Sequence, residues 1–357
     1  MKTSPLHLLR FLNLLCAMAL ASVSVRAADA SSSPTPNPSA VPAGGGAAGF
    51  GPGGAGGRGG AGLGGAAGRG GFGGGGARGG LAQIVVGPPA PVPPQVAIPR
   101  PTAAELAQVN EAVKKFAASD SSGIKPLLDR FPGLIAVQPP RANVAATFTQ
   151  TQQRVGARHA GFVALAKQGG IDLLFEGDSI TDWWFDQTTH EPTAAFAKYF
   201  GGMKVADFAI AGDTTQGVLW GLHNGEGQGF SPKAIMLMIG TNNTGSNTPA
   251  EIAEGIGAII LENRQDFPNA KILLLAVFPR DTPAHANRLK IAEINKLIAK
   301  LDDHQHVFYL DIGAKFLDPA TGVFLPDAFR GDNLHPQEKG YAIWGEAVKD
   351  ILADFMK

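Results

Sequence analysis

The sequence has almost no cysteine. Its 357 residues contain one, Cys16, which lies in an apolar run near the amino terminus, Phe11–Val25. The rest of the chain can therefore form no disulfide and offers no cysteine nucleophile or thiolate metal site. Two basic residues precede the run, and Val25-Arg26-Ala27 after it has the small residues of a cleavage site. These features predict a signal peptide over residues 1–27 and a secreted protein, periplasmic or extracellular.

A second long apolar run is missing from the sequence. The run beside Cys16 is itself shorter than the roughly 20 residues that a membrane span needs. We therefore expect no stable membrane insertion once the signal peptide has been cleaved.

Acidic residues are absent between Asp29 and Glu105. In the same part of the chain, residues 44–80 hold 23 glycines and residues 30–100 hold eleven prolines. Such a segment buries too little apolar surface to offset the entropy of ordering it, and its glycines lack the strict period of collagen. We predict a disordered Ser/Pro/Gly-rich linker over residues 28–100.

The net charge of zero hides an uneven distribution. Residues 1–100 carry a formal charge of +6 and residues 101–357 carry −6. A mildly acidic folded part argues against a nucleic-acid partner. Three Arg-Gly-Gly steps, at Arg58, Arg69 and Arg78, leave open a linker that binds RNA or an anionic surface, although a plain spacer is favoured.

The folded part is expected to have two regions. Residues 101–154 are predicted to form a helical extension, because Thr102 and Glu105 make a capping box and apolar residues follow at helical spacing through Phe116. Residues 155–357 are predicted to form the main domain, and the stretch near residues 120–150 is expected to pack on it.

Short apolar runs alternate with helical patterns in the main domain. One helix is expected to begin at the capping box Thr248–Glu251 and another to cover the last 20 residues or so. Strands that are apolar throughout indicate a parallel sheet covered on both faces. We predict an α/β fold, a three-layer α/β/α sandwich with a five-stranded parallel sheet. Its expected strands are Ile171–Glu176, Met203–Ile210, Lys233–Ile239, Ala270–Phe278 and His306–Leu310.

Polar residues follow the first three predicted strands. Ser179 comes after the first strand, Gly212 after the second and Asn242 after the third. Parallel strands end at the same rim of a sheet, so these residues are expected to lie near one another. A serine there can serve as a nucleophile, and a glycine N–H with an asparagine amide can hold an oxyanion. Taken singly, each of the three is an ordinary turn or helix-cap residue.

A serine nucleophile needs a base and a carboxylate that orients the base. Asp332 stands three residues before His335, a spacing that can place both at one imidazole. Asp303 and His306 have the same spacing, but they precede the fifth strand and are expected at the opposite rim. We interpret that second pair as part of a solvated loop and predict no metal site.

Together these residues resemble the SGNH, or GDSL, hydrolase superfamily over residues 155–357. Within it the chain is most similar to the catalytic subunits of type Ib platelet-activating-factor acetylhydrolase. The stretches that carry the resemblance are Leu174–Trp183, Gly212–Trp220, Asn224–Glu226 and Gly240–Asn243. Thr181 stands where an α/β-hydrolase elbow needs glycine, which disfavours that other fold.

The resemblance implies an esterase that uses no cofactor. Ser179, Asp332 and His335 would form its catalytic triad, and Ser179, Gly212 and Asn242 its oxyanion hole. The expected substrates are short-chain, acetyl-type esters of small molecules or of polysaccharide. A lysophospholipase-like lipid esterase and an inactive carbohydrate-binding module remain alternatives, and the oligomeric state is left open.

Overall fold

The computed structural model describes residues 85–121 and 123–357. The predicted signal peptide and most of the predicted linker lie outside these residues. The longer helices are α2 Ala103–Ala118, α4 Ala157–Gln168, α8 Pro249–Asp266, α9 Ala286–Ile298 and α10 Glu338–Phe355; the shorter ones are α3 Lys125–Arg130, α5 Ser179–Asp182, α6 Ala194–Phe200 and α7 Thr215–Gly221. The strands are β1 Leu173–Gly177, β2 Val205–Asp207, β3 Ala234–Met238, β4 Lys271–Leu275 and β5 Val307–Leu310.

All five strands pair in parallel, in the order β2-β1-β3-β4-β5. The chain leaves β1 for β2 on one side and then crosses to β3 on the other. This reversal of direction creates a crevice beyond the carboxyl end of β1, where parallel sheets commonly bind their ligands. The loops that follow β1, β2 and β3 therefore converge at one rim.

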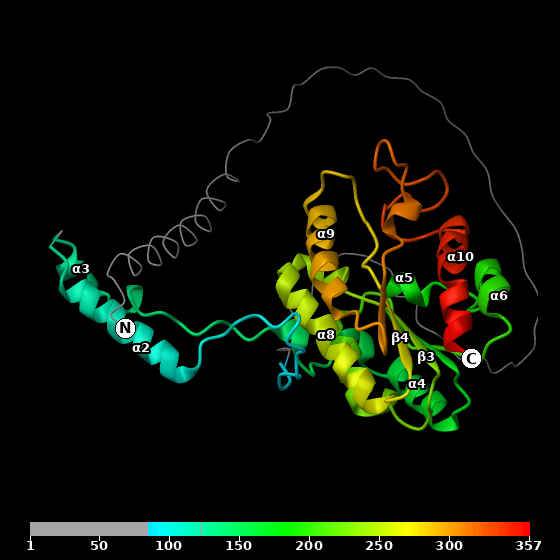
Figure 1. Cartoon of the computed structure of the whole chain (residues 1–357), viewed down its shortest axis with the longest axis horizontal. Coiled ribbons are helices and arrows are strands. Elements are labelled where there is room, and N and C mark those ends of the chain that lie inside the picture. Colours follow the sequence, from blue (N-terminus) through cyan, green and yellow to red (C-terminus); the bar gives the residue numbers. More distant parts are fainter. Residues whose placement is uncertain (1–84, 122) are drawn as a thin grey trace, which may run out of the picture. The chain divides into compact units, whose positions relative to one another are not determined.

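Helices cover both faces of the sheet (Figure 1). Helices α4, α7, α8 and α9 pack on one face around Leu174, Ile235 and Leu274, and α6 and α10 pack on the other around Phe175 and Met236. Alternate residues of each strand enter opposite cores, as a strand requires. The predicted α/β/α sandwich with five parallel strands is confirmed.

Residues 85–100 lie against α8, although we had assigned them to the linker. Ala90 and Val96 are buried, and a Cβ on Gly257 would meet the Val96 side chain at 2.8 Å. The fully buried Glu254 accepts from the Ile98 N–H at 2.7 Å and from both terminal nitrogens of Arg100 at 2.7 Å. We call residues 85–100 the strap.

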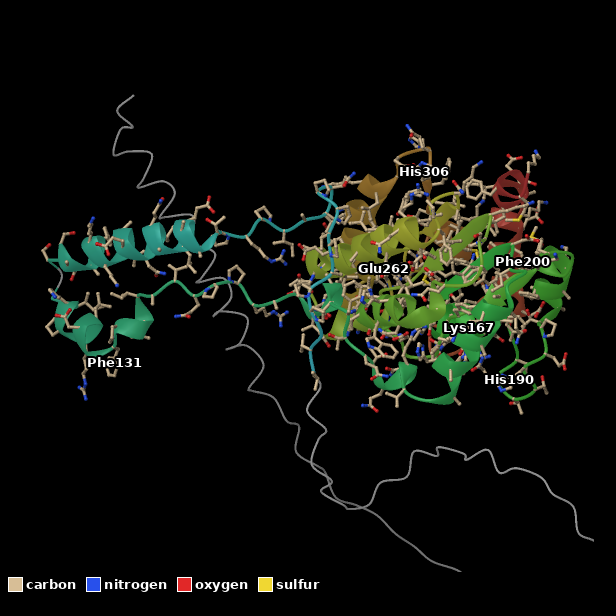
Figure 2. The ribbon with its side chains drawn as sticks, turned by 90° about the horizontal axis from the view of Figure 1, so that it is seen from below. Phe131, Lys167, His190, Phe200, Glu262 and His306 are labelled. Atoms are coloured by element: carbon tan, nitrogen blue, oxygen red, sulfur yellow. The ribbon has the colours of Figure 1, made fainter. Side chains whose placement is uncertain are left out.

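Helices α2 and α3 bury none of their side chains. The capping box of Thr102 and Glu105 is present, so the predicted helix start is correct. Its apolar face is nevertheless exposed at Phe116, and Phe131 beyond α3, labelled in Figure 2, is about half exposed. No helix among the described residues has both the length and the apolar character to cross a membrane.

One carboxyl group lies in the middle of the sheet. Glu176 on β1 is 2% exposed, and its Oε2 accepts from Asn263 Nδ2 at 2.7 Å while its Oε1 has no partner among the described residues. Burial raises the pKa of this carboxyl to about 8. Glu176 is therefore protonated in the folded protein at neutral pH.

This predicts that the protein becomes more stable as the pH falls from about 8 toward 4.5, the ordinary pKa of the group. In that window the folded state holds a proton that the unfolded state has released, so the free energy of unfolding rises on acidification. Glu176→Gln keeps an oxygen for Asn263 and should flatten this dependence in urea unfolding from pH 5 to 9. An unchanged slope in the variant would contradict the assignment.

Candidate active site

Ser179 stands at the carboxyl end of β1, as predicted. Gly177 ends the strand, and Asp178 caps α5 by accepting from the Ile180 N–H at 3.0 Å. A Cβ on Gly177 would lie 2.6 Å from the Met238 carbonyl oxygen, so this position needs glycine. The helix cap is thus Asp178, which leaves the Ser179 hydroxyl free for another partner.

That partner is His335. Ser179 Oγ lies 2.9 Å from His335 Nε2, and His335 Nδ1 lies 2.7 Å from Asp332 Oδ2. The second oxygen of Asp332 accepts from the N–H groups of Leu334 and His335 at 3.0 and 3.1 Å. Asn333 adopts the left-handed conformation, φ 52°, that closes this short turn. The structure thus brings together the three side chains predicted as a triad.

The pKa values of the two carboxyl groups near the Ser179–His335 pair are shifted in opposite directions. Burial raises the pKa of Asp332, but hydrogen bonds from the His335 ring and from the two N–H groups outweigh it and leave that pKa below its usual range. Burial raises the pKa of Asp178 to about 7, against one hydrogen bond from Ile180. Asp332 is therefore the carboxylate that stays charged next to the imidazole.

The loops after β2 and β3 lie together at the same rim. Gly212 adopts φ +80°, a conformation that other residues rarely take. Asn242 Nδ2 donates to the Asp213 carbonyl oxygen at 2.8 Å, and Asn243 Oδ1 accepts from the Thr215 N–H at 3.0 Å. The backbone N–H groups of Ser179 and Gly212 donate to no described backbone carbonyl.

A buried ion network beneath the Gly212 loop was missed in the sequence. Arg154 Nε donates to Asp213 Oδ2 at 2.7 Å, a terminal nitrogen of Arg154 pairs with Glu226, and His159 Nδ1 lies 2.7 Å from Glu226 Oε1. Arg154, Asp213 and Glu226 are at most 1% exposed. Asp213 follows Gly212 directly, so Arg154 anchors that loop. The sequence gives one sign of this network. Asp213 and Glu226 lie in two stretches that carry the resemblance to the hydrolase superfamily, and neither stretch contains a lysine or an arginine.

A second contact on the His335 imidazole was also missed. The Trp183 ring stacks on the His335 ring with centroids 3.9 Å apart at 24°, and the Arg330 guanidinium carbon lies 4.5 Å from the Trp183 centroid. Trp183 and Arg330 also line a cavity of about 290 Å³, together with Glu338. The neighbouring Trp184 is fully buried and belongs to the core.

The other Asp-x-x-His pair lies apart from these residues. Asp303 Oδ1 accepts from the N–H groups of Gln305, His306 and Val307, which forms a turn ahead of β5. Figure 2 labels His306 on this loop. In the part of the chain that the structure describes, no three His, Cys, Asp or Glu side chains are grouped so that they could hold a metal ion.

Comparisons with known proteins identify the family of the chain. Residues 175–343 match the GDSL-like lipase/acylhydrolase family. The chain is 35% identical over 216 residues to the alpha2 subunit of platelet-activating factor acetylhydrolase IB from Rattus norvegicus, covering 60% of this chain and 90% of the relative. It is also 35% identical over 140 residues to the beta-subunit homolog from Drosophila melanogaster, covering 39% of this chain and 59% of that protein. A solved acetylxylan esterase mutant from Geobacillus stearothermophilus aligns with 18% identity, TM-score 0.41, and coverage of 52% and 94%.

The chain belongs to the GDSL-like acylhydrolases of the SGNH superfamily. It is a carboxylic ester hydrolase, most similar to the acetylhydrolase-like branch. A serine hydroxyl hydrogen-bonded to a histidine, which is itself held by a carboxylate, is an arrangement suited to acyl transfer.

We expect Arg154→Met to destabilise the protein by roughly 3–5 kcal/mol, because it leaves Asp213 and Glu226 buried without their cation. Urea unfolding would measure this loss. Lys296→Met is the matched control, since Lys296 pairs with Glu293 at the surface, where ion pairs contribute about 0–1 kcal/mol. Equal losses in the two variants would show that the buried network does not hold the loop.

Proposed function

We propose that this protein is an exported serine esterase that removes short acyl groups, of the acetyl type, from a hydroxyl-bearing carrier. The observation that carries the proposal is the hydrogen-bonded row of Ser179, His335 and Asp332 at the rim where β1, β2 and β3 end. The proposed oxyanion donors, on Ser179, Gly212 and Asn242, come from the three loops at that rim.

In the first half of the reaction, His335 Nε2 takes the hydroxyl proton of Ser179 as Oγ attacks the ester carbonyl carbon. The carbonyl oxygen becomes an oxyanion, which accepts from the backbone N–H groups of Ser179 and Gly212 and from Asn242 Nδ2. The intermediate then collapses, the carbon–oxygen bond to the alcohol breaks, and His335 returns its proton to the leaving alcohol. Asp332 balances the positive charge on the imidazole throughout.

In the second half, a water molecule attacks the acyl-serine and gives its proton to His335. The oxyanion forms again in the same site. The bond between the acyl carbon and Ser179 Oγ breaks, Oγ recovers the proton from His335, and the carboxylic acid leaves. Asn242 keeps one amide hydrogen for this work, because its NH₂ group has two hydrogens and Asp213 accepts one.

The assignment of the acyl group and the assignment of its carrier are supported by different observations. The acetyl preference is supported by relatives that are 35% identical and carry the name acetylhydrolase. The predicted signal peptide supports a substrate outside the cytoplasm, which favours acetylated carbohydrate. Those same relatives favour, as the second candidate, a lipid ester of the platelet-activating-factor kind.

We expect Ser179→Ala to abolish hydrolysis of a nitrophenyl acetate and Asn242→Ala to lower kcat by roughly 10²–10³-fold. Both proteins should fold as the wild type does, judged by thermal unfolding. Asn247→Ala is a control on the same segment, because Asn247 contacts Asn243 and is outside the proposed oxyanion site. Full esterase activity in Ser179→Ala would refute the proposal.

Measurements on the purified protein should also distinguish the two candidate carriers, carbohydrate and lipid. Along a nitrophenyl ester series, kcat/KM is expected to be highest at acetyl and to fall with every added pair of carbons. Acetate release from acetylated xylan, measured beside release from an acetyl glycerophospholipid, then identifies the carrier. A maximum at long acyl chains would contradict the short-acyl assignment.

A further inference from the structure

The loop that carries His335 closes around the side chain of Trp183. The His335 ring stacks at 3.9 Å and the Arg330 guanidinium stands at 4.5 Å from the same indole. Two planar groups this close to one ring centroid cannot share one face, so the indole lies between them. The turn is closed by backbone hydrogen bonds from the Arg330 N–H to the His335 carbonyl and from the Asn333 N–H to the Arg330 carbonyl, at 2.8 and 3.0 Å.

Asp332, which is hydrogen-bonded to Nδ1 of His335, is exposed to solvent. The Asp332 side chain is 45% exposed, whereas the His335 side chain is 14% exposed. A hydrogen bond that meets water at one end fixes a ring less firmly than a buried one does. A stacked indole restrains the same ring across its whole face, and it attracts the ring more strongly once that ring gains a positive charge.

The Arg330 side chain contacts Trp183 and lines the same cavity. Within residues 85–121 and 123–357 it donates no hydrogen bond and forms no ion pair. It therefore occupies the indole face that His335 does not use. From there its charge acts against the positive charge that His335 acquires during catalysis.

We propose that Trp183 is a positioning residue for His335, and that Arg330 holds Trp183 in place while opposing protonation of the imidazole. The proposal rests on the proposed function, since it concerns the same base.

The first test replaces the indole. Trp183→Leu should lower kcat about tenfold on nitrophenyl acetate, with KM changed less than twofold, because a lost stack costs orientation and not substrate binding. Trp183→Phe keeps an aromatic face and should recover most of the rate. Labelling of Ser179 by a fluorophosphonate, which needs the serine–histidine pair but no particular substrate, should slow in parallel.

A matched control exists in the same region. Arg288 stands 5.0 Å from the centroid of Phe324, which stacks on Phe329 at 4.0 Å, so the control repeats the sandwich without a catalytic base. Phe324→Leu should leave kcat within twofold of the wild type. The proposal is overturned if this control loses as much as Trp183→Leu, or if the leucine and phenylalanine variants of Trp183 are equally slow.

The second test uses Arg330, which is at the surface and can be replaced without opening the core. The charged and titratable groups around the stack and the serine are Asp332 and Arg330 on the loop, Asp186 after α5, and Glu338 at the start of α10. Asp178, buried beside Ser179 with a pKa of about 7, is present in the wild type and in every Arg330 variant, so the comparison between them isolates the Arg330 charge. Arg330→Met should move the acid limb of the kcat/KM profile to higher pH by about half a unit, while Arg330→Lys keeps the charge and moves it less.

The outcomes distinguish the two proposals. If Ser179→Ala is inactive but the Trp183 variants have wild-type kcat and Arg330→Met has the wild-type acid limb, the positioning role is wrong and the esterase stands. If Ser179→Ala retains activity, the proposed function itself is wrong.

Discussion

The position of β1 between β2 and β3 is the constraint on which the site depends. Parallel pairing makes all three strands end at one rim, and the change of direction after β2 opens that rim to a ligand. The strand order alone therefore brings Ser179 and the loops of Gly212 and Asn242 close together. The fourth contribution, the turn of Asp332 and His335, comes from the segment before α10. Helix α10 packs with α6 on the sheet face around Phe175 and Met236.

The strands and helix starts that the sequence predicts correctly all depend on local patterns of residues. Apolar runs gave the five strands, and the two capping boxes gave the starts of α2 and α8, because each depends on residues within a few positions of one another. The spacing of Asp332 and His335 fixed their pairing for the same reason. Gly212 and Asn242 followed from their places after the second and third predicted strands, and the family resemblance then distinguished them from ordinary turn residues.

The parts that sequence reasoning missed are contacts between distant segments. Arg154 contacts Asp213 and Glu226, which lie 59 and 72 positions later in the sequence. Arg330 likewise contacts Trp183, which is far from it in the sequence. Nothing in the composition near residues 85–100 distinguishes a free linker from the strap, since the strap depends on Glu254 of α8. The oxygens of Glu176 likewise look solvent-exposed by residue type, and only the sheet shows that they are not.

The strap also determines where mechanical load enters the protein. Any pull transmitted along the chain from residues before the strap first meets the hydrogen bonds of Gly87, Pro88 and Ala90 to the segment 146–149. It reaches the bonds of Ile98 and Arg100 to Glu254 on α8 only after those. The force is thereby shared between the segment 146–149 and α8, and neither of these carries Ser179 or His335. An esterase tethered by its amino-terminal segment would therefore be loaded at two anchor points that lie outside its Ser179–His335–Asp332 row.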